Sequence, residues 1–362
     1  MGTQSAAVAA GLEGVVVAET QLSEVDGEKG RLVIAGEDVE TLAGAVSFET
    51  LCRRLWQPFR DDLPEDLQAS LGAARVRAFE RLGRLGDSLD AADGMDALRA
   101  AVGHVQLSPA APPEVELTGA VAVYAAVWAR RQRGEAPVPP DPTLGHAADL
   151  YRMVLGAPDP ARAAGLEAYL VTVSDHGMNA STFTARVVTS TGSDPVSAVV
   201  AAIGALKGPL HGGAPGPVLD MLDAIGRPER AAGWLEEELL VGRRIMGMGH
   251  RIYRVRDPRA AVLERAVERL ERAGIQSERL ALARAVERAA EDVLRKKHPD
   301  RPLRANVEFY TAVLLDAVGL PRTLFSPAFA CGRVAGWCGH CLEQRKTGRL
   351  IRPASRYVGP MP

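Results

Sequence analysis

Apolar residues recur at helical spacing along almost the whole chain, and this pattern is the feature that most limits the folds open to it. From about residue 39 onward they return every three or four positions, as Leu63, Leu67 and Leu71 do. Only two short runs, Val15–Glu19 and Arg31–Ala35, resemble strands, and the glycines between them suit a turn. The sequence therefore predicts an all-α fold with one short N-terminal β-hairpin.

Size and charge narrow the classes of function. A chain of 362 residues can bury a large core, and its low aromatic fraction of 5% leaves many small side chains, which suit closely packed helices. The formal net charge of -2 provides no general attraction to nucleic acid or to an acidic membrane. Any anion must therefore be bound by arginines that cluster locally.

The termini, apolar runs and cysteines indicate a cytoplasmic protein. The first twelve residues lack the basic and apolar parts of a secretory signal, and apolar runs such as Ala120–Ala129 are too short to cross a bilayer. Three of the four cysteines are crowded between Cys331 and Cys341, unlike the framework of a secreted disulfide protein. We expect free thiols.

Three histidines lie in loops next to expected helix starts: His176, His211 and His250. A lone histidine is more often a satisfied surface or core residue, but three in such settings favour a site. Glycines beside His211 and His250 allow the backbone to approach a ligand closely, and their N–H groups can hold an anion. Alternatively, these glycines only shape turns.

His211 is also a candidate electrophile. A helix is expected to begin near Pro217, and the positive end of a helix disfavours imidazolium. A neutral imidazole can donate a hydrogen bond to a developing enolate oxygen, as the electrophilic histidine of triosephosphate isomerase does.

Glu308 is a candidate base. Asn306 suits an N-cap, so Glu308 falls in the first helical turn, where the helix dipole is expected to lower its pKa and keep it ionised. A first-turn glutamate is also commonplace as a purely stabilising residue. The other candidates are arginines, whose rigid fork matches a carboxylate: Arg254, Arg256, Arg259, Arg333 and Arg352.

Taken in order, these motifs resemble the citrate synthase family. The resemblance covers nearly the whole chain and rests on the hairpin turn at residues 26–30, the His176 loop, Gly208-Pro209-Leu210-His211-Gly212-Gly213, Gly247-Met248-Gly249-His250, Asp257-Pro258-Arg259, Asn306-Val307-Glu308 and Gly332-Arg333-Val334-Ala335-Gly336-Trp337. It implies the condensation of acetyl-CoA with oxaloacetate and water to give citrate and CoA, the first step of the tricarboxylic acid cycle. No cofactor is implied, since the CoA thioester is a substrate.

The resemblance also implies three catalytic residues. His211 would hydrogen-bond the acyl-CoA carbonyl while the carboxylate at Glu308 removes the α-proton, and His250 would polarise the oxaloacetate carbonyl. The family generally has Asp at the position of Glu308. One extra methylene moves the carboxylate by roughly an ångström, which can cost on the order of 100-fold in rate unless the backbone compensates.

Binding residues follow in the same way. The oxaloacetate carboxylates would be held by His176, Arg259 and Arg333, with Arg352 reaching in from the partner subunit of a homodimer. CoA would be bound by Arg254 and by the backbone of Gly247, Met248 and Gly249.

A division into two domains is implied as well. A small helical domain at 212–314 would interrupt a large helical domain formed by 1–211 and 315–362. Oxaloacetate bound between the domains would drive their closure and complete the acyl-CoA site.

Three other interpretations compete. Cys338-Gly339-His340-Cys341 matches a redox pair, although the βαβ setting of such pairs is missing and the segment falls inside an expected helix. Buried thiols are therefore the expectation. The altered position 308 also suits a non-catalytic homologue that binds acyl-CoA and a dicarboxylate. Within the enzymes, 2-methylcitrate synthase, which uses propionyl-CoA, stays open. No metal site is expected, because ligand spacing is missing.

Overall fold

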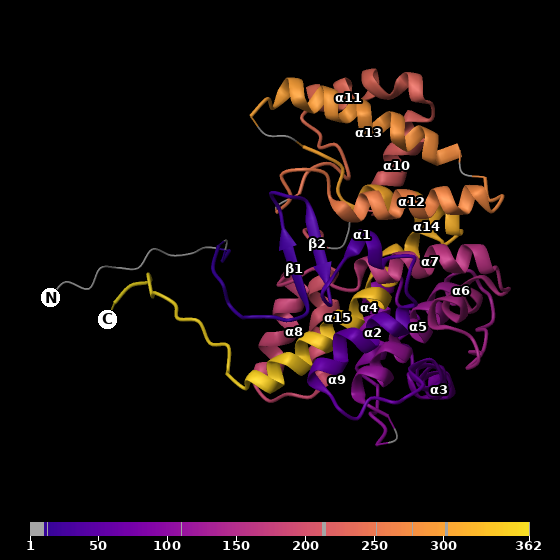
Figure 1. Ribbon diagram of the computed structural model, residues 1–362, viewed down its shortest axis with the longest axis vertical. Helices are drawn as coiled ribbons and strands as arrows, with labels where there is room; N and C mark the ends of the chain where they lie inside the picture. The colour runs from indigo at the N-terminus through magenta and orange to yellow at the C-terminus, as the bar shows by residue number, and fades with distance from the viewer. Residues whose placement is uncertain are drawn as a thin grey trace.

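Helices make up most of the structure, which confirms the predicted all-α fold (Figure 1). The computed structural model describes residues 11–12, 14–109, 111–211, 215–250, 252–276, 278–300 and 303–361. Its helices are α1 (Val39–Leu42), α2 (Phe48–Trp56), α3 (Leu67–Glu80), α4 (Gly94–Val102), α5 (Pro113–Gln132), α6 (His146–Leu155), α7 (Pro160–Val173), α8 (Ala180–Ser190), α9 (Pro195–Leu206), α10 (Pro215–Ile225), α11 (Ala231–Leu240), α12 (Pro258–Arg272), α13 (Glu278–Lys297), α14 (Val307–Val318) and α15 (Phe325–Thr347). Short 3-10 helices are η1 (Gln57–Phe59), η2 (Leu82–Arg84), η3 (Pro228–Arg230) and η4 (Arg322–Leu324).

The N-terminal sheet differs in part from the prediction. β2 (Arg31–Ile34) forms as expected, but its antiparallel partner is β1 (Ser23–Asp26), and a two-residue β3 (Glu37–Asp38) adds to the other edge. The expected strand at Val15–Glu19 is wrong. Asp26 pairs directly with Arg31 across a tight turn. The strand that pairs with β2 is therefore the segment directly before this turn, not the earlier apolar run at Val15–Glu19.

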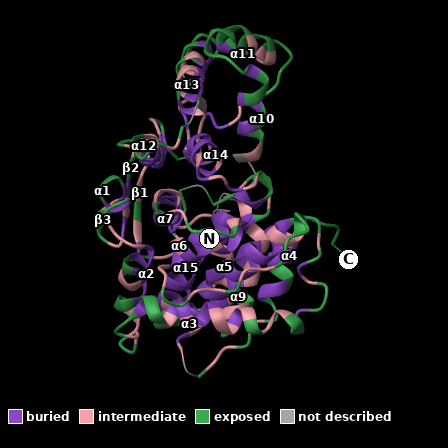
Figure 2. Cartoon of the chain, turned by 90° about the vertical axis from the view of Figure 1, so that its right-hand side faces the viewer, coloured by how far each residue is buried: buried purple, intermediate pink, exposed green. Residues whose placement is uncertain are grey.

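The core is built around α5 and α15, which pack against each other and are surrounded by other helices (Figure 2). α5 is buried over most of its length because α3, α4, α6 and α15 all contact it. Close packing needs small residues here: a Cβ on Gly119 of α5 would lie 2.8 Å from the Cβ of Ala74 in α3. This arrangement matches the small-residue composition of the chain.

Helix starts follow the capping signals in the sequence. Asp194 and Asp257 each accept a hydrogen bond from a first-turn N–H, and a proline follows each of them. Asn306 caps α14 in the same way. Beyond the body, α10, α11 and α13 lie together at the upper end in Figure 1. α12 and α14 pack against each other and also contact α7 of the body.

Among the described residues, no helix is long and apolar enough to span a membrane.

Candidate active site

Three aromatic rings from two segments that are distant in the sequence lie close together. His176 lies between α7 and α8, while His250 and Tyr253 precede α12. The ring centroids of His176 and His250 are 5.6 Å apart, and that of Tyr253 is 4.8 Å from His250. The His176 Nε2 atom also lies 3.1 Å from the Tyr253 hydroxyl. The structure therefore brings together two of the three predicted histidines directly.

His250 is held in one tautomer. Its Nδ1 accepts hydrogen bonds from the backbone N–H groups of Ile252 at 3.0 Å and Tyr253 at 3.2 Å, so the proton of the neutral ring resides on Nε2. That Nε2 lies 3.5 Å from Nη2 of Arg259. Both groups are donors, so they suit an acceptor oxygen placed near both. Burial, together with the charge of Arg259, lowers the pKa of His250 to about 4.

Asp257 organises the residues on this side of the site. Its carboxylate accepts two hydrogen bonds from the Arg259 guanidinium, at 3.0 and 2.7 Å, and one from the backbone N–H of Val307 at 3.1 Å. It also caps α12. Because Val307 begins α14, this one buried carboxylate fixes Arg259 beside the helix turn that carries Glu308.

Glu308 is tied to the His250 loop through its N-cap. The Asn306 Oδ1 accepts the Glu308 N–H at 3.0 Å, and the Asn306 Nδ2 donates to the carbonyl of Gly249 at 2.9 Å. Met248 and Ala305 add an antiparallel bridge between the same segments. The segments that carry Glu308 and His250 are therefore joined directly by hydrogen bonds.

The expected lowering of the Glu308 pKa is wrong. Burial raises its pKa to about 7, although the Arg259 charge acts in the opposite direction. The desolvation of a carboxylate outweighs the field of one helix N-terminus, which falls off within a turn. A carboxyl that titrates near neutral pH is well matched to accepting a proton from a weak acid.

His211 has a lowered pKa, as predicted, but the main cause is burial rather than the helix end that was expected. Its Nε2 accepts the backbone N–H of Ser181 at 3.3 Å and lies 2.8 Å from the Ser181 hydroxyl, in the first turn of α8. The proton is therefore on Nδ1, which is left as a donor. Burial is the largest cause that lowers the pKa of His211 to about 4, and the charge of Arg333 acts in the same direction. The expected helix start near Pro217 is at Pro215.

Arg333 is a buried cation with an unused donor. Its side chain is 1% exposed, its Nε donates to the carbonyl of Val173 at 2.6 Å, and its guanidinium lies 4.8 Å from the centroid of the Phe329 ring. Among the described residues, its Nη2 has no hydrogen-bond partner. Burial lowers the pKa of Arg333 to about 10. A buried guanidinium with a free donor is suited to an anionic ligand.

The residues expected to bind CoA or to reach across a dimer interface are two exposed arginines and the loop backbone at residues 247–249. Gly247 and Gly249 have φ angles of +73° and +87°, which other residues rarely adopt, and a Cβ on Gly247 would lie 2.9 Å from Phe309. Arg254 is exposed. Arg352 is exposed in the segment beyond α15 that leaves the body (Figure 1), so it lies outside the buried group of histidines and arginines.

Sequence reasoning missed several residues of the site. Tyr253, Ser181 and Asp175 were not singled out, and Asp257 was named only as part of the Asp257-Pro258-Arg259 motif. Their positions could have indicated them, since each lies within five residues of a predicted histidine or arginine. The hydrogen bonds that they make to distant segments could not be predicted from the sequence.

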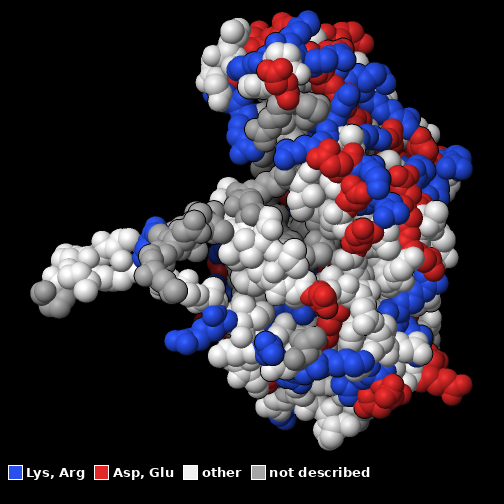
Figure 3. All heavy atoms as spheres, turned by 60° about the vertical axis from the view of Figure 1, so that its left-hand side comes forward, with Lys and Arg blue, Asp and Glu red and all other residues white. Residues whose placement is uncertain are grey.

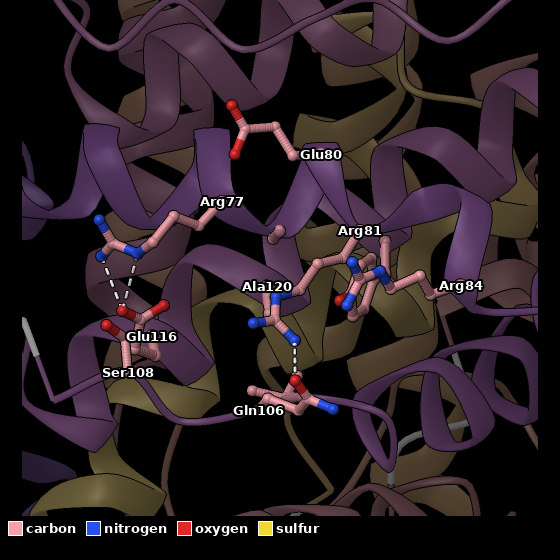
Figure 4. A pocket seen from close by; sticks show the side chains of 11 residues that line it. Arg77, Glu80, Arg81, Arg84, Gln106, Ser108, Glu116 and Ala120 are labelled. Atoms are coloured by element: carbon pink, nitrogen blue, oxygen red, sulfur yellow. Dashed lines mark hydrogen bonds and ion pairs between the residues drawn. The ribbon is translucent and has the colours of Figure 1, made fainter.

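A cavity of about 330 Å³ lies away from these residues, between α3, α5 and the segment at 105–108 (Figure 4). Its arginines are largely satisfied: Arg77 pairs with Glu116, and Arg81 donates to the Gln106 side chain at 2.6 Å. None of the predicted site residues lines it, so cavity volume does not identify the site.

The redox interpretation of residues 338–341 is contradicted. Cys338 and Cys341 are free, buried thiols in α15. Burial raises the pKa of Cys341 to about 11 and raises the pKa of Cys338 well above its usual range, so neither is a thiolate near neutral pH.

Comparison with known proteins gives one consistent family. The family model described as "Citrate synthase, C-terminal domain" matches residues 11–354. A "Putative citrate synthase 2" of Mycobacterium tuberculosis is 39% identical over 97% of this chain and 93% of its own length. A "2-methylcitrate synthase" of the same species is 36% identical over 96% of this chain and 90% of its own length.

Solved structures agree. The crystal structure of citrate synthase from Thermotoga maritima has a TM-score of 0.84 at 32% identity, covering 98% of this chain and 97% of that one. A ternary complex of carboxymethyl coenzyme A and oxaloacetate with citrate synthase from Thermoplasma acidophilum has a TM-score of 0.81 at 26% identity, covering 97% and 96%.

Proposed function

Because the chain belongs to the citrate synthase family, we propose that it condenses acetyl-CoA with oxaloacetate and water to give citrate and CoA. One observation carries the proposal beyond family membership. A single guanidinium, that of Arg259, influences the pKa values of His176, His211, His250 and Glu308, so all four belong to one electrostatic neighbourhood. Such a set combines a base, two neutral hydrogen-bond donors and a cation.

In the proposed reaction, Glu308 removes the α-proton of the acyl-CoA. His211, through Nδ1–H, donates a hydrogen bond to the thioester carbonyl and stabilises the enolate oxygen. His250, through Nε2–H, polarises the oxaloacetate carbonyl and then protonates the alkoxide. Hydrolysis of the citryl-CoA thioester releases the products. No cofactor or metal ion takes part in any of these steps.

Substrate binding is assigned to the flanking residues. His176, Arg259 and Arg333 hold the carboxylates of oxaloacetate. The Nη2 of Arg333, which has no hydrogen-bond partner in the described part of the chain, supports this role. Arg254 and the backbone at Gly247–Gly249 face CoA. A small domain at 212–314 and a large domain at 1–211 and 315–362 form the two sides of the proposed site. They close around oxaloacetate before acyl-CoA binds.

A homodimer in the cytoplasm completes the proposal, with Arg352 contributed across the interface. α9 is mostly apolar, yet Val196 and Val200 are only partly buried in one chain. Figure 3, which brings the left-hand side of Figure 1 forward, shows a broad area without charged side chains at mid-height. A face of this kind favours a second copy of the chain over nucleic acid or a membrane.

The test is the release of free CoA thiol by the purified chain. We expect release only when acyl-CoA and oxaloacetate are both present, and faster release from acetyl-CoA than from propionyl-CoA. The relative that is a 2-methylcitrate synthase supports the alternative substrate, and one methylene in an apolar pocket changes selectivity by only about 1–3 kcal/mol. Faster turnover of propionyl-CoA would select that alternative. Binding of both substrates without release would identify a non-catalytic homologue.

The acyl-transfer rate should depend on pH through Glu308. Its pKa is raised to about 7, so the carboxyl becomes protonated, and loses its function as a base, as the pH falls through that value. The pKa values of His211 and His250 are about 4, so both rings stay neutral over this range. We expect kcat/KM for acyl-CoA to fall tenfold per pH unit below the midpoint. A profile that stays flat down to pH 5 would exclude this assignment.

A further inference from the structure

A second group of buried polar residues lies directly behind the site. Asp175, Arg186, His340 and Glu343 come from three segments, and each is at most 4% exposed. His340 lies between its partners: Nε2 is 3.2 Å from the Asp175 carboxylate, and Nδ1 is 3.1 Å from Nη1 of Arg186. Arg186 also donates to Glu343 at 2.5 Å. None of the proposed chemical steps uses these residues.

The partners of His340 determine which of its ring nitrogens donates a hydrogen bond. A guanidinium has donors only, so the His340 Nδ1 next to Arg186 must accept, and the ring proton must be on Nε2. The Nε2–H therefore donates to Asp175. Burial by itself would raise the pKa of Asp175, but His340 and Ser23 hold it below its usual value. Asp175 is thus an ionised carboxylate fixed from two sides.

Asp175 in turn holds the segment that carries His176. The Ser23 hydroxyl of β1 donates to Asp175 at 2.5 Å and accepts the backbone N–H of Gly177 at 2.9 Å. α15 closes the other side: a Cβ on Gly336 would lie 2.2 Å from the carbonyl of Ser174. The backbone on both sides of His176 is therefore pinned through the Asp175 carboxylate.

One face of α15 aligns this half of the site. Arg333, Trp337, His340 and Gln344 follow one another at intervals of three or four residues, which places them on one helix face. Trp337 donates to the Ser181 hydroxyl at 3.0 Å, beside His211, and Gln344 accepts from Arg186 at 3.0 Å. The same face therefore carries Arg333, an expected ligand of a carboxylate. It also contacts Ser181, which binds His211, and Asp175, which precedes His176.

From this geometry we infer that His340 is a positioning residue: its Nε2–H, donated to Asp175, sets the place of the His176 ring and with it the binding of oxaloacetate. The inference rests on the proposed function for its substrate. It also assigns a role to the histidine of the Cys-Gly-His-Cys segment, whose thiols are buried and unreactive.

Two substitutions of His340 separate its two hydrogen bonds, because each keeps one of them and removes the other. In His340→Gln the side-chain amide can reach the position of Nε2 and donate to Asp175, but the acceptor for Arg186 is lost. In His340→Asn the amide oxygen can replace Nδ1 and accept from Arg186, but the donor to Asp175 is lost. Each variant gives up one buried hydrogen bond, so a purely structural role predicts equal effects.

We expect His340→Asn to raise KM for oxaloacetate roughly ten- to 100-fold, with KM for acyl-CoA at saturating oxaloacetate changed by less than about threefold. His340→Gln should recover most of the affinity for oxaloacetate. The exposed His104 provides a matched control, and His104→Asn should leave both constants unchanged. Equal effects of the Asn and Gln variants, or equal rises in both KM values, would overturn the inference.

The imidazole NMR signals of His176 and His340 supply a readout that does not need turnover. The wild type should show His340 as the Nε2–H tautomer, and the His176 resonances should move in His340→Asn but not in His340→Gln. If the wild type showed no turnover while these shifts appeared, the proposed function would fail and the positioning role would stand. Unmoved His176 resonances in both variants would reject the role itself.

Discussion

Replacing Glu308 by Gln should lower kcat for CoA release by roughly 10²- to 10⁴-fold, the usual contribution of a positioned base. Gln has nearly the same shape and can be hydrogen-bonded in the same place, but it cannot accept the α-proton. KM for oxaloacetate should change little, since the arginines and His176 are untouched. Steady-state kinetics with each substrate in turn measures both effects.

Glu308→Asp is the matched control, because the family generally has Asp at this position. It keeps a base but moves the carboxylate by roughly an ångström, so we expect a loss of at most about 100-fold in kcat. The pH midpoint near 7 should disappear in the Gln variant and persist in the Asp variant. Near-normal turnover of Glu308→Gln would show that another group is the base.

Arg333→Met should have opposite effects on binding and on stability. The variant removes the buried Nη2 that lacks a partner among the described residues. Two charge-assisted hydrogen bonds to a carboxylate, at about 1.5–3 kcal/mol each, correspond to a rise in KM for oxaloacetate of about 100-fold or more. The same change removes an incompletely satisfied buried charge, so the free energy of unfolding without substrate should increase by roughly 1–4 kcal/mol.

Thermal unfolding and kinetics on the same preparations test this pair of effects. Arg333→Lys keeps the charge but loses the planar fork, so its KM should lie between those of the wild type and Arg333→Met. Oxaloacetate should raise the unfolding temperature of the wild type and have little effect on the Met variant. A Met variant that is less stable and still binds oxaloacetate normally would mean that Arg333 is structural.

The fold could be predicted because its signals are local. Helical periodicity and capping residues are short-range patterns, and Asp194, Asp257 and Asn306 cap helices where the sequence places them. The strand at Val15–Glu19 failed because pairing depends on what the turn at Asp26 brings together, and a run of β-branched residues does not specify its partner.

The site could be predicted only in its residue types. His176 and His250 were both named as candidates, and their rings lie 5.6 Å apart. The pKa of Glu308 could not be read from its position in the first helical turn, because desolvation depends on the packing of distant segments. The same holds for His211, whose pKa is lowered mainly by burial, and whose Nε2 accepts from Ser181 of α8.

The Cys338–Cys341 segment shows how a short motif misleads. Its spacing matches a redox pair, but burial in α15 keeps the thiols protonated. The residue of the segment with polar partners on both sides is His340, which the motif would have treated as a spacer.

The most direct test of the whole account is a crystal structure of the chain with oxaloacetate and an unreactive acyl-CoA analogue. We predict that the analogue's acyl carbon lies within about 3–3.5 Å of the Glu308 carboxylate, with the His211 Nδ1 on the acyl oxygen and the His250 Nε2 on the oxaloacetate carbonyl. Oxaloacetate carboxylates should contact Arg259 and Arg333. A complex in which either molecule binds away from these groups would contradict the assignment of Glu308, His211 and His250 to one reaction.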